Sequence, residues 1–248
     1  MIRIKKGAKP SVLSQNETNW TRALLNAAAS YGSFKEIPDS EKKKLLSHYA
    51  HDDIKQVLFQ NRKCAYCECI PDGSSLQVEH FEPKSLYPEL AFHWENLLPS
   101  CGRCNQDKGG FDTRRYPIIN PEREDPETLL EYQAYNPLIM IPVKGTGQEE
   151  KAGRTVDVCN LNRPELFHAR ADLLIALTEY LKGLEDSIHK IEDSDTLLKK
   201  EKRIRKLRNS LDTIHSLLCD KAHYAGFCRW FVRHQDTFSK AEKLAATV

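Results

Sequence analysis

The sequence predicts an α+β protein that is mostly helical, with a small zinc-stabilised core between helical flanks. Three observations indicate this class. Two Cys-x-x-Cys pairs bracket a proline-rich stretch, and apolar residues recur at intervals of three and four both before and after it. Matched cysteine pairs are typical of a structural zinc ion, and the recurring apolar residues are typical of amphipathic helices.

The N-terminal segment, residues 1–60, is expected to be helical. Residues 17–30 form one expected helix, and residues 41–50 form a second that Asp39 or Ser40 would cap. A third is expected to begin at Asp52 or Asp53 and to run directly into Cys64. A helix would then deliver the first cysteine pair.

The remaining chain divides into three expected parts. Residues 61–112 form the core with its cysteine pairs, and within it residues 76–81 alternate as a short strand does. Residues 113–162 form a mixed extension with a strand near its middle, over residues 138–143. Residues 163–248 form a helical hairpin with a polar turn at residues 192–195, followed by one further helix that carries Phe227, Trp230, Phe231 and Phe238.

Composition limits the classes of function. Among 248 residues, 40% are hydrophobic and 29% are charged, which is typical of a globular protein. No apolar run approaches the ~20 residues of a membrane span, and no secretory signal is recognised, so we expect a cytoplasmic protein without membrane contact. The net charge is only +2, so if the protein binds nucleic acid, the binding must come from a local basic surface or from a partner protein.

The two cysteine pairs are separated by 33 residues and predict one closed zinc site with four thiolate ligands. With no open ligand position, this zinc is structural. The ligands are Cys64, Cys67, Cys101 and Cys104. The other cysteines are expected to be small buried or half-buried hydrophobic residues, although the first could be a spare ligand: Cys69, Cys159, Cys219 and Cys228.

Glu79 and His80 are the candidate catalytic pair, because they adjoin at the end of the expected strand. A carboxylate is a hard ligand for a magnesium-like ion, and an imidazole can take a proton from water near neutral pH. Since adjacent strand residues point to opposite faces, a local kink is expected to let both serve one site. Their position between the cysteine pairs is what makes this common dipeptide informative.

These motifs together resemble the HNH nuclease family, in its branch with a four-cysteine zinc site. The resemblance covers about a fifth of the chain. It implies a ββα-metal, treble-clef-like core. It is carried by Cys64-x-x-Cys67, Glu79-His80 with Pro83, Trp94-Glu95-Asn96-Leu97, and Cys101-x-x-Cys104-Asn105 with Lys108.

The resemblance implies a role for each matching residue. His80 corresponds to the general base, Asn96 to the residue that holds the loop and orients the base, and Glu79 to the acidic metal ligand. Asn105 stands where many relatives have a histidine ligand. A set of Glu79 and Asn105 oxygens favours magnesium or manganese as the catalytic ion. His93, away from the motif positions, is expected to be a surface or outer-shell histidine.

Softer motifs beyond the core are similar to a narrower family, the PtuB nuclease subunits. These act with the ATPase PtuA in Septu anti-phage defence, and relatives occur in some retron systems. The resemblance implies an ATPase partner, and residues 163–248 are the expected partner-binding region. The motifs are Ile119-Asn120-Pro121, Asp125-Pro126, Leu161-Asn162-Arg163 and Arg170.

One dense basic run lies on an expected C-terminal helix. A charge run on a helix is usually a solvated face, but contact with nucleic acid or with an acidic partner surface stays open. Lys84 and Lys108, beside the motif, are further candidates for such contact. The run consists of Lys199, Lys200, Lys202, Arg203, Arg205, Lys206 and Arg208.

Three functions compete. The first is cleavage of DNA in a two-component defence complex. The second is cleavage of RNA, including transfer RNA, because nothing in the motif distinguishes the two sugars. The third is a zinc-stabilised binding module with an inert centre. The joint presence of Glu79, His80, Asn96 and Asn105 argues against the third.

Overall fold

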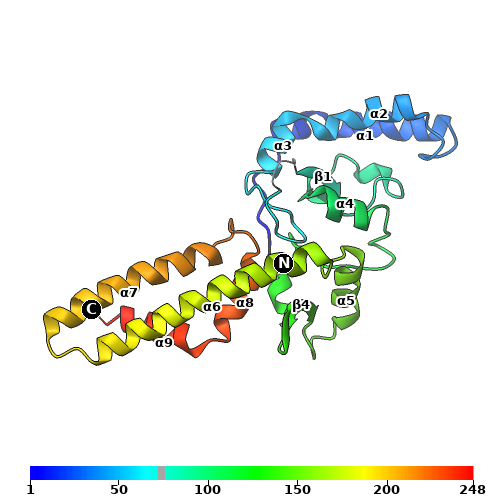
Figure 1. Cartoon of the computed structure of the whole chain (residues 1–248). Coiled ribbons are helices and arrows are strands. Elements are labelled where there is room, and N and C mark those ends of the chain that lie inside the picture. Colours follow the sequence, from blue (N-terminus) through cyan, green and yellow to red (C-terminus); the bar gives the residue numbers. More distant parts are fainter. Residues whose placement is uncertain (72–75, 248) are drawn as a thin grey trace.

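The computed structural model describes residues 1–71 and 76–247. Figure 1 shows three groups of elements: N-terminal helices at the top, a small strand-and-helix module beneath them, and long helices that extend to one side. The α+β, mostly helical class is confirmed. The helices are α1 (Ser11–Ser30), α2 (Asp39–Leu46), α3 (Asp52–Leu58), α4 (Gly102–Lys108), α5 (Glu149–Val158), α6 (Pro164–Glu192), α7 (Leu197–Leu218), α8 (Ala225–Arg233) and α9 (Asp236–Ala245).

Two antiparallel hairpins provide the strands. The first pairs β1 (Gln77–His80) with β2 (Leu97–Ser100), and α4 follows it directly. The second pairs β3 (Leu130–Gln133) with β4 (Asn136–Pro142) in the extension. Short 3-10 turns complete the described elements: η1 (Ser47–Ala50), η2 (Pro88–Leu90), η3 (Trp94–Asn96) and η4 (Pro126–Thr128).

The N-terminal helices differ from expectation at several ends. α2 begins at Asp39 with Pro38 as its N-cap, so neither Asp39 nor Ser40 caps it, and it ends at Leu46 before the 3-10 turn η1. α1 begins at Ser11, directly after Pro10, whose ψ of 143° is extended and whose ring suits the start of a helix. α3 ends at Leu58 and does not reach Cys64. A turn follows in which Arg62 has a left-handed φ of 54°, so the helix cannot continue. A turn therefore delivers the first cysteine pair.

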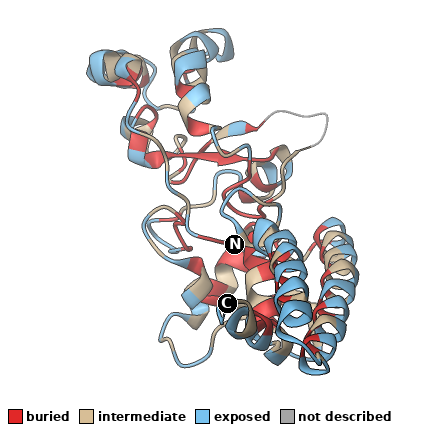
Figure 2. Cartoon of the chain, turned by 90° about the vertical axis from the view of Figure 1, so that its left-hand side faces the viewer, coloured by how far each residue is buried: buried red, intermediate tan, exposed pale blue. Residues whose placement is uncertain are grey.

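Two hydrophobic cores hold the module from opposite sides. One is formed by α1–α3 against Phe92, Trp94 and Leu97, which lie in the loop after β1 and at the start of β2. The other joins the cysteine segment to β3, β4 and the C-terminal helices. Figure 2 shows the buried residues concentrated between these elements, with exposed residues on the outer helix faces. The β1–β2 hairpin is thus fixed from both sides.

The C-terminal region forms the expected hairpin of α6 and α7. The single helix expected after it is instead two helices. Gln235 is extended, with φ of −119° and ψ of 111°, and separates α8 from α9. This break lets α9 turn back against α6 and α7, where Phe238 is buried. Among the described residues, none of these helices is long and apolar enough to cross a membrane.

Candidate active site and metal centre

The four predicted zinc ligands lie together and are buried. The Sγ atoms of Cys64, Cys67, Cys101 and Cys104 all lie within 4.8 Å of one another. In a tetrahedral site with zinc–sulfur bonds of ~2.3 Å, the sulfur atoms are about 3.8 Å apart. The Cys67 and Cys101 sulfurs are 3.7 Å apart. The thiols therefore fit one zinc ion in number, chemistry and spacing.

Backbone contacts position these thiols. The Cys64 N–H donates to the Cys69 carbonyl at 2.9 Å, which closes the first turn. The Ala65 N–H donates to the Pro99 carbonyl at 2.8 Å, which attaches this turn to β2. Burial raises the pKa of the Cys64 thiol, so four thiolates here would need a cation to stabilise them. A zinc ion would supply that charge.

Arg163 adds a contact that the sequence did not reveal as part of the zinc site. Its Nη1 lies 3.5 Å from Cys104 Sγ and 3.1 Å from the Asn160 carbonyl. The side chain is buried and comes from the residue before α6. A guanidinium beside a thiolate complements its charge. The Leu161-Asn162-Arg163 motif is the signal that marked this position.

The remaining cysteines are dispersed. Cys69 is half-buried and its sulfur lies 3.4 Å from Cys67 Sγ, but it is outside the four-thiol group. Cys159 and Cys228 are buried, as expected. Cys219 is exposed, so its expected burial was wrong. It follows the end of α7, where the chain leaves the helical hairpin.

Glu79 and His80 occupy a regular antiparallel strand. Glu79 pairs with Leu98 and His80 with Leu97, without a shift in register. The kink expected between them is therefore absent from the described strand. Neighbouring strand residues point to opposite faces, and the two side chains accordingly contact different parts of the protein. The cross-strand pairing holds both residues in place.

Lys108 links the two residues. Its Nζ lies 2.5 Å from Glu79 Oε1 and donates to the His80 carbonyl at 2.9 Å. Lys108 is 2% exposed, so it differs from the surface contact that the sequence suggested. It is the last residue of α4, and it reaches back to β1 because the helix packs on that strand. Lys108 thus belongs to the interior of the site.

Glu79 lies entirely inside the protein. It is 2% exposed, and the Tyr66 hydroxyl donates to its Oε1 at 3.3 Å. Burial raises the pKa of Glu79, while the Lys108 ammonium acts against that rise. Tyr66 comes from the first cysteine turn, so the zinc segment and the candidate acid are directly connected. Tyr66 is a site residue that motif spacing did not indicate.

The His80 imidazole is oriented by a backbone carbonyl. Its Nε2 lies 2.9 Å from the Ala91 oxygen, and a carbonyl can only accept, so Nε2 carries the proton. Nδ1 is then the unprotonated nitrogen. Burial, reinforced by the Lys84 ammonium, lowers the pKa of His80 to about 3. The imidazole is therefore neutral at pH 7 and has the form that a general base requires.

Asn96 holds the loop between the strands. Its Oδ1 accepts from the Glu82 N–H at 2.7 Å, and its Nδ2 donates to the Glu82 carbonyl at 3.0 Å and to the Leu90 carbonyl at 3.2 Å. The residue is 4% exposed. These bonds fix the segment that ends at Ala91, whose carbonyl orients His80. Asn96 therefore acts on the imidazole through the loop.

Asn105 and Lys84 lie at the margin of the site. Asn105 is half-buried, and its Nδ2 donates to Gln77 Oε1 at 2.7 Å. Among the described residues, Asn105 makes no hydrogen bond with Glu79. Lys84 is half-buried, burial lowers its pKa, and its charge acts on His80. Exposed His93 instead contacts Glu95 at 2.9 Å.

The basic run lies on α7, near the end of the α6–α7 hairpin and away from β1 and α4 (Figure 1). Three of its members have local partners: Lys199 pairs with Asp195 at 2.9 Å, Arg203 with Ser194, and Arg208 with the Ala245 carbonyl. The other members are exposed: Lys200, Lys202, Arg205 and Lys206. The run is therefore separate from the candidate active site.

Comparisons with known proteins agree with this geometry. The HNH endonuclease family model matches residues 64–111. A Septu protein PtuB from Bacillus thuringiensis is 36% identical over 167 residues, which cover 66% of this chain and 55% of that relative. A second Septu protein PtuB, from Bacillus mycoides (strain KBAB4), is 28% identical over 254 residues, which cover 86% of this chain and 83% of the relative.

A third relative is a retron Vc95 protein of Vibrio cholerae serotype O1 biovar El Tor, whose name describes it as an HNH endonuclease. It is 25% identical over 156 residues, which cover 57% of this chain and 76% of the relative. The first match spans only about half the length of its relative. The match at residues 64–111 includes all four clustered cysteines and the Glu79-His80 pair. The chain therefore carries an HNH endonuclease domain, and it is similar to the Septu PtuB proteins.

Proposed function

We propose that this chain is a metal-dependent HNH endonuclease that hydrolyses phosphodiester bonds of DNA. The observation that supports this most is the state of His80. It is neutral, and its Nε2 is bonded to the Ala91 carbonyl, so Nδ1 is left to take a proton from the attacking water. Lys84, at the margin of the same site, is the cation suited to a phosphate oxygen.

Glu79 and Asn105 would hold the catalytic magnesium or manganese ion. A carboxylate and an amide oxygen suit a hard cation, which keeps its other positions for water and phosphate. Such an ion supplies stabilisation of the charge on the phosphate and on the leaving oxygen. At present Lys108 neutralises Glu79. A metal ion would therefore compete with the Lys108 ammonium for the Glu79 carboxylate, and this competition would lower the affinity for the ion.

The four-cysteine site would hold a structural zinc ion. All four ligand positions of a tetrahedral ion are filled by Cys64, Cys67, Cys101 and Cys104. The same cluster lies between β1–β2, α4 and Arg163. Its role is to hold the hairpin that carries His80. Reduced thiols of this kind are consistent with a cytoplasmic protein.

The activity is tested with purified chain on supercoiled plasmid in magnesium or manganese. We expect nicking that His80→Ala abolishes while the zinc content stays the same. A matched single-stranded RNA and a transfer RNA substrate decide between DNA and the alternative RNA activity. No cleavage of any of these substrates, with or without the partner ATPase, would favour an inert zinc-stabilised module.

The partner in this proposal is an ATPase similar to PtuA, and it docks on the C-terminal region. The names of two relatives place them in Septu, which supports a defence function. Leu197 and Leu198, where the α6–α7 turn enters α7, are 81% and 77% exposed. Apolar side chains this exposed are suited to contact another protein. Exposed Lys200 beside them favours an acidic surface on that partner.

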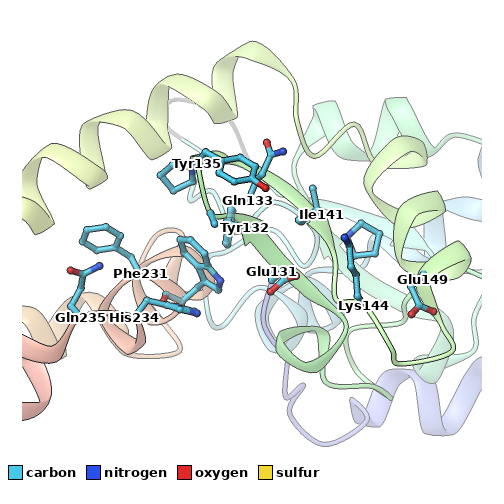
Figure 3. Close-up of a pocket in the computed structure, with 14 residues that line it drawn as sticks. Glu131, Tyr132, Gln133, Tyr135, Ile141, Lys144, Glu149, Phe231, His234 and Gln235 are labelled. Atoms are coloured by element: carbon cyan, nitrogen blue, oxygen red, sulfur yellow. The ribbon is translucent and has the colours of Figure 1, made fainter.

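A pocket of about 810 Å³, lined by the β3–β4 hairpin and by α8 of the C-terminal region, offers a second docking place apart from these leucines. Figure 3 shows it between the β3–β4 hairpin and α8, with Tyr135 on one side and Phe231 and His234 on the other. Tyr135 is 91% exposed. The lining is rich in aromatic and aliphatic side chains and has one lysine, Lys144, against the two carboxylates of Glu131 and Glu149, so an apolar protein segment suits it better than a phosphate backbone.

A further inference from the structure

Tyr49 contacts the candidate general base although it lies outside the matched HNH residues 64–111. Its ring and the His80 imidazole have centroids 4.7 Å apart and planes at 85°. This is the edge-to-face arrangement that aromatic rings favour. Tyr49 comes from η1 in the N-terminal segment. The imidazole therefore has a carbonyl at one nitrogen and an aromatic ring against it.

The same Tyr49 ring also contacts the Lys84 ammonium. The Lys84 Nζ lies 5.4 Å from the ring centroid, within the range of a cation–π contact. A lysine stem has four rotatable bonds, so without such a contact its ammonium would sample many positions. One ring thus touches both the base and the cation nearest to it. No other aromatic ring in the described part of the chain contacts both His80 and Lys84.

The position of Tyr49 is set by the N-terminal helices. Its neighbour His48 stacks on Trp20 of α1, with ring centroids 4.6 Å apart and planes at 3°. Trp20 in turn contacts Phe92, in the loop whose Ala91 carbonyl binds His80. η1 is therefore fixed relative to the catalytic loop. This packing holds the Tyr49 ring in one position beside His80.

We propose that Tyr49 is a positioning residue of the nuclease site, which holds the His80 imidazole and the Lys84 ammonium in their working places. The inference rests on the proposed endonuclease function. It assigns the N-terminal segment a part in catalysis, because that segment supplies an aromatic ring, outside residues 64–111, that contacts both His80 and Lys84. It also predicts an effect on His80 that can be measured without cleavage.

His80 needs a second support because its hydrogen bond to the Ala91 carbonyl holds only one atom of the imidazole and does not by itself fix the plane of the ring. Rotation about the Cβ–Cγ bond would remove Nε2 from the carbonyl and permit the other tautomer. In that tautomer Nδ1 carries the proton and cannot act as a base. A displacement of the base by about 1 Å can cost ~100-fold in rate. The Tyr49 ring opposes this rotation sterically.

The test compares Tyr49→Phe, which keeps the ring, with Tyr49→Leu and Tyr49→Met, which remove it. The matched control is Phe34→Leu. Phe34 is also half-buried in the N-terminal segment, and Lys42 Nζ lies 5.6 Å from its ring centroid, but among the described residues its ring does not contact His80. Nitrogen-15 NMR of the whole protein reports the tautomer, with the His80 signals assigned from His80→Gln.

We expect the wild type, Tyr49→Phe and Phe34→Leu to show His80 with the proton on Nε2 alone. Tyr49→Leu and Tyr49→Met should show averaging between tautomers at unchanged zinc content. In cleavage assays kcat should fall by roughly 10- to 100-fold for these two variants and by less than about threefold for Tyr49→Phe and Phe34→Leu. A second effect, through Lys84, should raise KM for the substrate.

Two results would overturn the inference. One is a single Nε2-protonated tautomer of His80 in both folded Tyr49→Leu and folded Tyr49→Met. The other is a loss of kcat in Phe34→Leu equal to that in Tyr49→Leu, which would indicate general packing. If the wild type cleaves no nucleic acid, the endonuclease proposal fails. The NMR comparison still decides whether Tyr49 positions His80.

Discussion

Lys108 Nζ lies 2.5 Å from Glu79 Oε1, and this buried pair joins the end of α4 to the strand that carries His80. The ammonium also binds the His80 carbonyl at 2.9 Å. The Lys108 side chain thus holds both the Glu79 carboxylate and the backbone of His80 in place. The pair makes the helix a direct support of the candidate active site.

Lys108→Met should destabilise the protein by about 3–5 kcal/mol, because it leaves the Glu79 carboxylate buried without its cation. Replacing both residues, as Lys108→Met with Glu79→Gln, should recover much of this loss. Urea unfolding monitored by circular dichroism measures both. The control is Arg103→Met, which removes an exposed pair with Asp107 from the same helix and should cost less than about 1 kcal/mol. Equal costs for Lys108→Met and Arg103→Met would contradict this role.

Replacing any zinc ligand should remove the zinc ion and most of the stability of residues 64–111, because binding of structural zinc is part of the folding free energy. Cys101→Ser is the most direct change, since Cys101 Sγ also accepts from the Cys104 N–H at the start of α4. Cys219→Ser, at an exposed cysteine, is the control and should keep one zinc per chain. Metal analysis and thermal melting measure the outcome. Well-folded wild-type protein without zinc would refute the assignment.

Three replacements in the candidate active site should differ in their response to metal. His80→Ala should lose ~10²–10⁴-fold in cleavage rate at every metal concentration, because the base itself is gone. Glu79→Gln, which keeps the side-chain volume and an oxygen that Lys108 can bind, should weaken the catalytic ion, so higher magnesium or manganese should partly restore cleavage. Asn96→Ala should fall between them, since the loop then aims the base poorly. Exposed His93→Ala is the control.

Titrating metal against cleavage rate separates these cases. Near wild-type cleavage by His80→Ala would overturn the assignment of the base, whatever the other variants do. Full rescue of His80→Ala by metal would indicate that the residue is a ligand. A Glu79→Gln enzyme with wild-type metal dependence would remove Glu79 from the metal site.

Partner docking is better tested by surface replacements than by truncation. Removing residues 163–248 would expose the zinc segment, because Lys63 Nζ binds the Asp220 and Ala222 carbonyls and Arg163 contacts Cys104. Such a truncated chain would misfold for reasons unrelated to the partner. Point changes at exposed side chains avoid this difficulty.

The combined variant Leu197→Ser, Leu198→Ser and Tyr135→Ala should bind the purified ATPase at least ~10-fold more weakly, since exposed apolar anchors commonly provide 1–2 kcal/mol each. The separate variants show which surface contributes. Leu25→Ser, a 38% exposed leucine on α1, is the control. Calorimetry measures the dissociation constants. Wild-type affinity of the combined variant would exclude both surfaces.

Much of the site followed from local sequence. The spacing of Cys64, Cys67, Cys101 and Cys104 predicted a group of thiols that the structure brings together. Helical periodicity predicted the α6–α7 hairpin, because burying one face of a helix requires apolar residues every three or four positions. Each Cys-x-x-Cys pair and each helical repeat reflects geometry within a few residues. They are therefore readable without knowing the fold.

Tertiary structure decided what surrounds those residues. Tyr49 reaches His80, and Lys108 lies inside beside Glu79, because two separate cores press the N-terminal helices and α4 against the β1–β2 hairpin. A lysine in a sequence gives no sign of whether its charge faces water or a buried carboxylate. The sequence alone determined the chemistry available to this protein. Packing between segments distant in sequence decided which groups meet, since burial and pairing depend on the whole fold.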